Sequence, residues 1–196
     1  MRRGTVVLAV ALVATGCSSS GRNTVIFDTG RIGPLKVDRS SATDVIAYAG
    51  SPDVDVGGVE YGGTPYRALG YDCSREPSDD LFPVLETPRA GRHGPSCKTV
   101  FWINSRTRRL GDVYTSSNHY SEEHGVRIGM KTASAERLLH VRAVVGCGAA
   151  IFPGGRRGIV TVALDGGFTG SSLNGGHVYA FALHGGRSDI GIFDCL

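Results

Sequence analysis

The sequence predicts an α+β protein made of two tandem small units, each with a short helical layer packed on one face of an antiparallel β-meander. Two correspondences within the chain support this fold class. Segments 99–113 and 179–193 lie a constant 80 residues apart and share the alternating pattern of a β-hairpin. Segments 35–46 and 126–139 each have a short strand and a turn before a helix. We expect residues 31–118 to form the first unit and residues 119–196 the second.

Residues 1–16 have the pattern of an export signal, with Arg2 and Arg3 before an apolar run at 6–14. That run is much shorter than the roughly 20 residues of a membrane-spanning helix. The following Ala14-Thr15-Gly16-Cys17 resembles the lipobox of bacterial lipoproteins. The resemblance implies that Cys17 receives a diacylglyceryl group and becomes the mature N-terminus. The alternative is an ordinary secretory signal cut near Ala14, with Cys17 left as a thiol.

Residues 17–30 are expected to join the lipidated cysteine to the folded units as a flexible tether, because residues 18–23 are small and polar. The chain carries 21 basic and 18 acidic residues. Removal of Arg2 and Arg3 with the signal leaves 19 against 18, and no basic run remains. The sequence therefore gives little support to a nucleic-acid partner and favours attachment to the membrane through the acyl chains.

The other four cysteines form an even set, which favours disulfides in an oxidising compartment. Three pairings are possible. We favour Cys73 with Cys97 and Cys147 with Cys195, because each repeat unit then holds one pair. A zinc site is disfavoured because the chain has no Cys-x-x-Cys pair. A thiol nucleophile at Cys147, near His140, is the remaining alternative.

In the first unit, Ser41 three residues before Asp44 predicts a helix N-terminus, and Gly50 before Pro52 predicts its end. A strand at 67–72 follows, then an irregular loop at 74–96 and a hairpin that turns at 104–108. In the second unit the equivalent strand is 160–165 and the equivalent turn is 184–187. Its helix is expected to end near Gly146.

The Gly129-Met130 lead and the Gly50-Ser51-Pro52 close look like the domain shared by small outer-membrane-assembly lipoproteins and the β-lactamase inhibitor protein, which carries two tandem copies. The resemblance covers most of residues 31–195. It implies a tandem fold and a binding role. The alternative is one continuous α+β domain whose halves look alike because hairpins share turn chemistry.

Motifs of catalysis are absent from the sequence: it has no Gly-x-Ser-x-Gly, no phosphate-binding Gly-x-x-x-x-Gly-Lys and no His-Glu-x-x-His. The segment from His119 to His124 is the nearest to a metal cluster, and we interpret it as a solvated linker. We expect no metal, no small-molecule cofactor and no catalytic residue.

One face of the paired strands, which includes Phe101 and Phe181, is expected to pack under the helices. The opposite face carries Lys98 and Trp102, and we expect it to be open. Trp102, the only tryptophan, then either packs at the junction of the units or anchors a partner. Three further aromatic residues extend this candidate surface: Tyr61, Tyr66 and Phe82.

The sequence therefore favours a non-enzymatic, lipid-anchored envelope protein that binds another envelope or secreted protein. The first alternative is an inhibitor of a secreted β-lactamase or penicillin-binding enzyme, for which Asp53, Asp55 and Tyr61 lie in a suitable early loop. The second alternative is an extracytoplasmic enzyme of unrecognised type.

Overall fold

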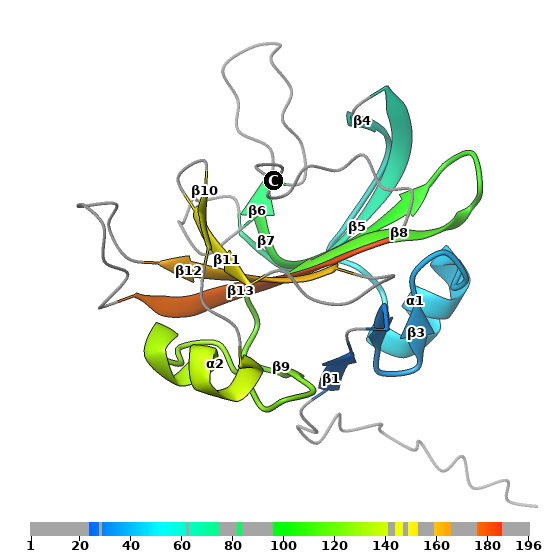
Figure 1. The fold of residues 1–196 in the computed structure, drawn as a ribbon. Coiled ribbons are helices and arrows are strands. Elements are labelled where there is room, and N and C mark those ends of the chain that lie inside the picture. Colours follow the sequence, from blue (N-terminus) through cyan, green and yellow to red (C-terminus); the bar gives the residue numbers. More distant parts are fainter. Residues whose placement is uncertain are drawn as a thin grey trace, which may run out of the picture.

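The computed structural model describes residues 24–27, 29–61, 63–74, 82–83, 96–140, 144–146, 149–152, 159–165 and 176–185. The described chain is mostly β-strand and folds around two sheets (Figure 1). In chain order its elements are β1 (Thr24–Phe27), β2 (Arg31–Ile32), β3 (Leu35–Lys36), α1 (Ala42–Ala49), β4 (Val54–Tyr61), β5 (Thr64–Ser74), β6 (Phe82–Pro83), β7 (Ser96–Asn104), β8 (Arg109–Thr115), β9 (Tyr120–Glu122), α2 (Thr132–Leu139), β10 (Val144–Gly146), β11 (Ala149–Phe152), β12 (Ile159–Asp165) and β13 (His177–His184).

The large sheet is antiparallel and has the strand order β10-β11-β12-β13-β8-β7-β5-β4, with β6 pairing beside this path on β7. Strands β7 and β8 form the predicted hairpin around residues 105–108. The pairing of β8 with β13 runs from Thr115 opposite Phe181 to Asp112 opposite His184. Strands from both predicted units therefore belong to one sheet.

The small sheet has the order β3-β2-β1-β9. Strand β1 pairs in parallel with β9, with Val25 opposite Ser121, and antiparallel with β2, with Ile26 opposite Ile32. Both isoleucines are buried, so this sheet presents an apolar side to the core. Strand β1 occupies residues that the sequence assigned to the tether, and β9 occupies part of the segment interpreted as a solvated linker. That linker interpretation is wrong for Ser121 and Glu122, which are buried.

Both helices are short. Helix α1 begins at the predicted cap: the Ser41 hydroxyl accepts a hydrogen bond from the backbone N–H of Asp44, whose carboxylate accepts one from the Ser41 N–H. Helix α2 ends at His140 in a left-handed conformation, so the expected end near Gly146 is wrong. At eight residues each, neither described helix is long enough to cross a bilayer.

Two hydrophobic clusters lie on opposite faces of the large sheet. The first packs the sheet against the small sheet and both helices, and its central members are Ile26, Ile32, Val45, Leu69, Phe101, Leu110, Ala135, Phe181 and Leu183. The second contains Val59, Tyr66, Ala68, Cys97, Val100, Trp102, Tyr114 and Ala180. Figure 1 shows α1, α2 and the small sheet on one side of the large sheet, with β4 and β10 curving toward the other.

The predicted fold class is wrong. The described residues form two sheets with only two short helices, in place of a helical layer on each meander. The face that includes Phe101 and Phe181 is covered as expected, but by the small sheet together with the helices. The physical reason is that Ile26 and Ile32, on strands of four and two residues, supply apolar surface that the helices are too short to provide.

Candidate binding surface

The face expected to be open is covered at Trp102 and Tyr66. Trp102 and Tyr66 are each 0% exposed and belong to the second cluster, so neither offers a surface to a partner. The expectation that Trp102 anchors a partner is therefore corrected in favour of its packing alternative. Small side chains explain how it fits, since Ala68 lies opposite Trp102 on β5 and Ala180 lies in the same cluster.

The structure places only some of the other predicted site residues. Lys98 is exposed on β7, and at Tyr61 and Phe82 the description covers only the backbone, at the end of β4 and in β6. Cys17, Cys147 and Cys195 lie outside the described residues. Lipidation of Cys17 and the second disulfide stay predictions.

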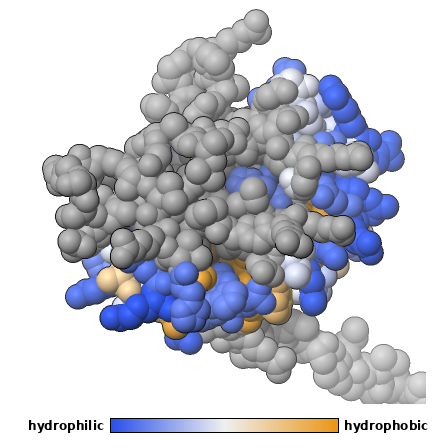
Figure 2. All heavy atoms as spheres, viewed as in Figure 1, coloured by the Kyte–Doolittle hydropathy of each residue, from blue (hydrophilic) through white to orange (hydrophobic). Residues whose placement is uncertain are grey.

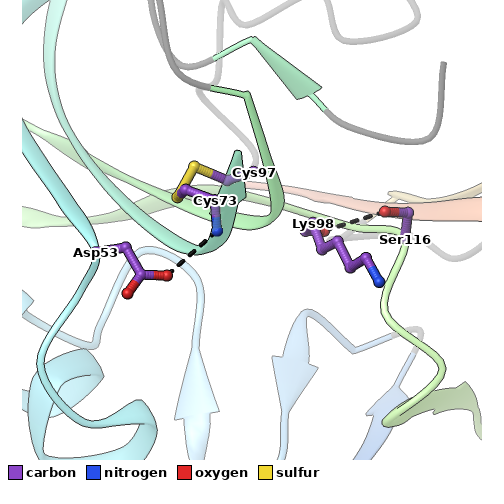
Figure 3. Close-up of a disulfide and its surroundings, with 5 residues drawn as sticks. All are labelled: Asp53, Cys73, Cys97, Lys98 and Ser116. Carbon is purple, nitrogen blue, oxygen red and sulfur yellow. Dashed lines mark hydrogen bonds between the residues drawn. A yellow bond between two sulfur atoms is a disulfide. The ribbon is translucent and has the colours of Figure 1, made fainter. Parts of the chain in front are cut away.

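A disulfide joins Cys73 on β5 to Cys97 on β7, the pairing favoured on sequence, at a sequence separation of 24 (Figure 3). The two cysteines face each other in the strand register. Gly70 leaves room for the bond, because a Cβ there would lie 2.5 Å from the Sγ of Cys97. The Asp53 carboxylate accepts a hydrogen bond from the Cys73 N–H at 3.2 Å, which ties the residues before β4 to this end of β5.

Three tyrosines meet beside this disulfide, where α1, β5 and β9 come together. Tyr48, Tyr71 and Tyr120 are half-buried against the first cluster. The Tyr71 hydroxyl donates to the backbone oxygen of Gly50 at 3.1 Å, and its ring meets Phe101 edge-on at 5.7 Å.

The hydroxyl of Tyr48 lies 2.7 Å from that of Thr24 on β1. Its close approach depends on Gly33, which has a φ of +55° and where a Cβ would lie 3.2 Å from the Tyr48 hydroxyl.

Two of these tyrosines, Tyr71 and Tyr120, have raised pKa values. Burial, followed by the negative charges of Asp55 and Asp53, raises the pKa of Tyr71 to about 12. Burial also raises the pKa of Tyr120, with further contributions from Tyr48 and Asp72. The hydroxyls of Tyr71 and Tyr120 therefore stay protonated near neutral pH and can donate hydrogen bonds.

Three exposed carboxylates lie near two of the tyrosines, Asp53 and Asp55 near Tyr71 and Asp72 near Tyr120. Asp55 forms a two-pronged ion pair with Arg67 on β5, with contacts of 2.7 and 2.6 Å, and the bonds from Arg67 lower its pKa. Asp72 has a left-handed φ of 53°. We define the acid–tyrosine surface as Tyr48, Tyr71, Tyr120, Asp53, Asp55 and Asp72.

Sequence reasoning missed most of this surface. It singled out Asp53 and Asp55, but Tyr48 and Tyr120 lie 72 positions apart and no motif links them. The parallel pairing of β1 with β9 is what brings Tyr120 to α1. Lys98 is on the adjacent strand at the same end of the sheet, and Figure 3 shows its side chain pointing away from the disulfide.

Two other groups of titratable side chains lie outside the acid–tyrosine surface. Asp112, fully buried on β8, bonds through Oδ1 to Nδ1 of His184 on β13 at 2.9 Å. Among the described residues no serine hydroxyl or cysteine thiol bonds to His184, so this part of the chain supplies no catalytic triad at the pair. Its position across the β8–β13 pairing indicates a structural role.

The second group is Glu122, Glu123 and His124, whose ligand atoms lie within 4.8 Å of one another. The buried carboxylate of Glu122 accepts from both the backbone N–H and the ring Nδ1 of His124, at 2.7 and 2.5 Å. These bonds satisfy Glu122 within its own turn. The arrangement stabilises the turn after β9 and gives no independent sign of a metal.

No family model matches the chain, and no curated protein matches its sequence. The crystal structure of the uncharacterized protein yfeY from Escherichia coli is similar to this structure, with a TM-score of 0.51 and 13% identity, over 82% of this chain and 99% of that one. An extracellular protein containing an SCP domain from Bacillus anthracis gives a TM-score of 0.39 and 9% identity, over 74% and 43% of the two chains. At such identities the first likeness concerns the fold alone, and the second is too weak to support any argument.

Proposed function

We propose that this chain is an exported, lipid-anchored envelope protein that binds another protein through the acid–tyrosine surface. The observation that carries the binding role is the grouping of exposed carboxylates with half-buried tyrosines. Tyrosines offer apolar area and a hydroxyl at small entropic cost, which makes them common in protein interfaces. The carboxylates favour a partner that presents lysine or arginine side chains.

The scarcity of exposed apolar side chains on the described surface supports the same site. Among the described residues Leu138, 39% exposed, is the one large apolar side chain that is exposed, so this part of the chain offers no apolar docking patch. A partner with a polar binding surface therefore suits this site better than one with an apolar surface. Export and lipidation are supported by Ala14-Thr15-Gly16-Cys17 and by the Cys73–Cys97 disulfide, since disulfides persist in oxidising compartments.

The test of binding is affinity capture with the full-length protein in detergent, comparing Asp72→Asn with Glu60→Gln. Both replace an exposed carboxylate by its amide, and asparagine accepts the left-handed backbone of Asp72. We expect a captured protein whose yield falls several-fold with Asp72→Asn and is unchanged with Glu60→Gln. Equal yields from both variants would contradict this binding site.

The test of anchoring is mass spectrometry of the mature N-terminus, where we expect a diacylglyceryl adduct on Cys17. An unmodified Cys17 would contradict the anchor without affecting the binding site. The inhibitor and enzyme alternatives stay predictions, and no contact in the described residues favours either.

A further inference from the structure

Four arginines gather where the β7–β8 turn meets the segment after β3. Arg106 and Arg108 belong to the turn, Arg109 begins β8, Arg39 follows β3, and all four are exposed. We call these four residues the arginine tip. Figure 2 shows hydrophilic residues over the side of the molecule where Figure 1 draws the β7–β8 hairpin.

The backbone of the tip is held in one conformation. The Asn104 side-chain oxygen accepts from the N–H groups of Arg106 and Thr107 at 2.9 and 3.0 Å. The Arg108 N–H donates to the backbone oxygen of Asn104 at 2.7 Å, with Arg108 at a φ of 58°. This turn fixes the positions from which its guanidinium groups project.

Two of the guanidinium groups are anchored through carbonyl oxygens. Arg109 Nη1 donates to the backbone oxygen of Arg39 at 2.9 Å, and Arg106 Nη2 donates to that of Gly63 at 3.1 Å. Each guanidinium has five N–H donors, so most remain for a ligand. The contacts leave the positive charges without a carboxylate partner.

The neighbouring carboxylate of Asp44 is engaged mainly with Ser41. Arg109 contributes to lowering the pKa of Asp44, but the larger causes are the hydrogen bonds from Ser41 that cap α1. The ion pairs of the described chain join Arg67 to Asp55, His124 to Glu122 and His184 to Asp112, and none includes a tip arginine. The tip therefore presents four exposed arginines against the exposed carboxylates of Asp38 and Asp44, an excess of positive charge.

We propose that the arginine tip binds the phosphate groups of anionic phospholipids in the membrane that holds the lipid anchor. Guanidinium groups match the geometry of phosphate oxygens and bind them in pairs of hydrogen bonds. This inference rests on the proposed lipid anchoring. Thr24, where β1 begins, follows Cys17 by seven residues, which reach at most about 25 Å when extended.

Such a short connection keeps the folded residues beside the headgroups and raises the effective phosphate concentration at the tip. Because two acyl chains already make a stable anchor, contact at the tip orients the folded part on the bilayer. Each arginine near an anionic surface strengthens binding several-fold, so removing two of the four should weaken it roughly 10- to 30-fold.

The experiment is co-sedimentation of the full chain carrying Cys17→Ala, which cannot be acylated, with vesicles of phosphatidylcholine alone or mixed with phosphatidylglycerol. Two double variants are compared: Arg106→Gln with Arg108→Gln, and Arg127→Gln with Arg137→Gln. The second pair removes the same charge from exposed positions, Arg127 between β9 and α2 and Arg137 in α2. Circular dichroism checks that each variant is folded.

We expect binding to vesicles that contain phosphatidylglycerol, weakened by salt and by the tip variant but retained by the control variant. Any contribution of residues 1–16, including Arg2 and Arg3, is common to the tip and control variants and is removed by their comparison. Equal binding to both compositions, or equal loss in both variants, would overturn the proposal. So would tip-dependent binding to duplex DNA at lower concentrations than to the vesicles. Lipid binding at the tip with an unmodified Cys17 in the native protein would refute the anchor and leave the tip intact.

Discussion

Trp102 gives a prediction about packing at the scale of a single residue. It is the only tryptophan, it is fully buried, and large-to-small substitution of such a side chain typically costs about 3–5 kcal/mol. We expect blue-shifted emission protected from acrylamide in the native protein, and a loss of that size from the free energy of unfolding in Trp102→Ala. Urea denaturation followed by circular dichroism measures the loss. Emission typical of water, quenched freely, would show that Trp102 is exposed after all.

Tyr71 gives a prediction about alkaline pH. Its pKa is raised to about 12, whereas an unfolded tyrosine ionises near pH 10, so the folded state keeps its proton longer. Stability that is complete below pH 10 is therefore lost as the pH rises toward 12. We expect the free energy of unfolding to fall across this window, with a smaller slope in Tyr71→Phe. An identical slope in the variant would contradict the burial of this hydroxyl.

Helix α1 allows a test at the scale of one element. Ser41 caps the helix, and replacing such a cap by alanine typically costs about 1 kcal/mol. Ser134 is a matched control, because it lies inside α2, where Lys131 is the N-cap residue and makes no side-chain cap bond. We expect urea denaturation to show the loss for Ser41→Ala and little change for Ser134→Ala. Equal stability of the two variants would mean that the cap contributes nothing.

The elements differ in how far the sequence predicted them. The start of α1 and the β7–β8 hairpin follow from local chemistry, since Ser41 and Asp44 form a capping box and residues 104–108 form a turn. Strands β1, β2 and β9 were missed because two to four residues are too few for a periodic pattern. The end of α2 was also missed, because His140 ends it without the glycine or proline that usually marks a helix terminus.

At the scale of the whole molecule, the two predicted units are joined through β8 and β13. A fragment of residues 24–118 would leave the edge of β8 unpaired and would remove Phe181 and Leu183 from the first cluster. We expect this fragment to lack cooperative thermal unfolding, whereas the full chain should unfold cooperatively in the same buffer. A sharp transition in the fragment would show that the first unit folds by itself, as a tandem arrangement requires.

The candidate surface was also predicted only in part from the sequence. The sequence predicted the pairing of Cys73 with Cys97 and drew attention to Asp53 and Asp55, all of which lie at one end of β5 and the residues beside it. It placed the binding face at Trp102, which is buried in the second cluster. Strand alternation tells which residues share a face, but it does not tell what covers that face.

The sequence by itself determined the features that depend on neighbouring residues: the cap of α1, the turn between β7 and β8, and the alternation that separates Phe101 from Trp102. Only the tertiary structure decided the features that depend on distant segments. These are the joining of both halves in one sheet, the parallel pairing of β1 with β9, and the meeting of three tyrosines with three carboxylates. The physical reason is that turns and caps are fixed by bonds across a few residues, whereas which strands become neighbours depends on how the whole chain buries its apolar surface.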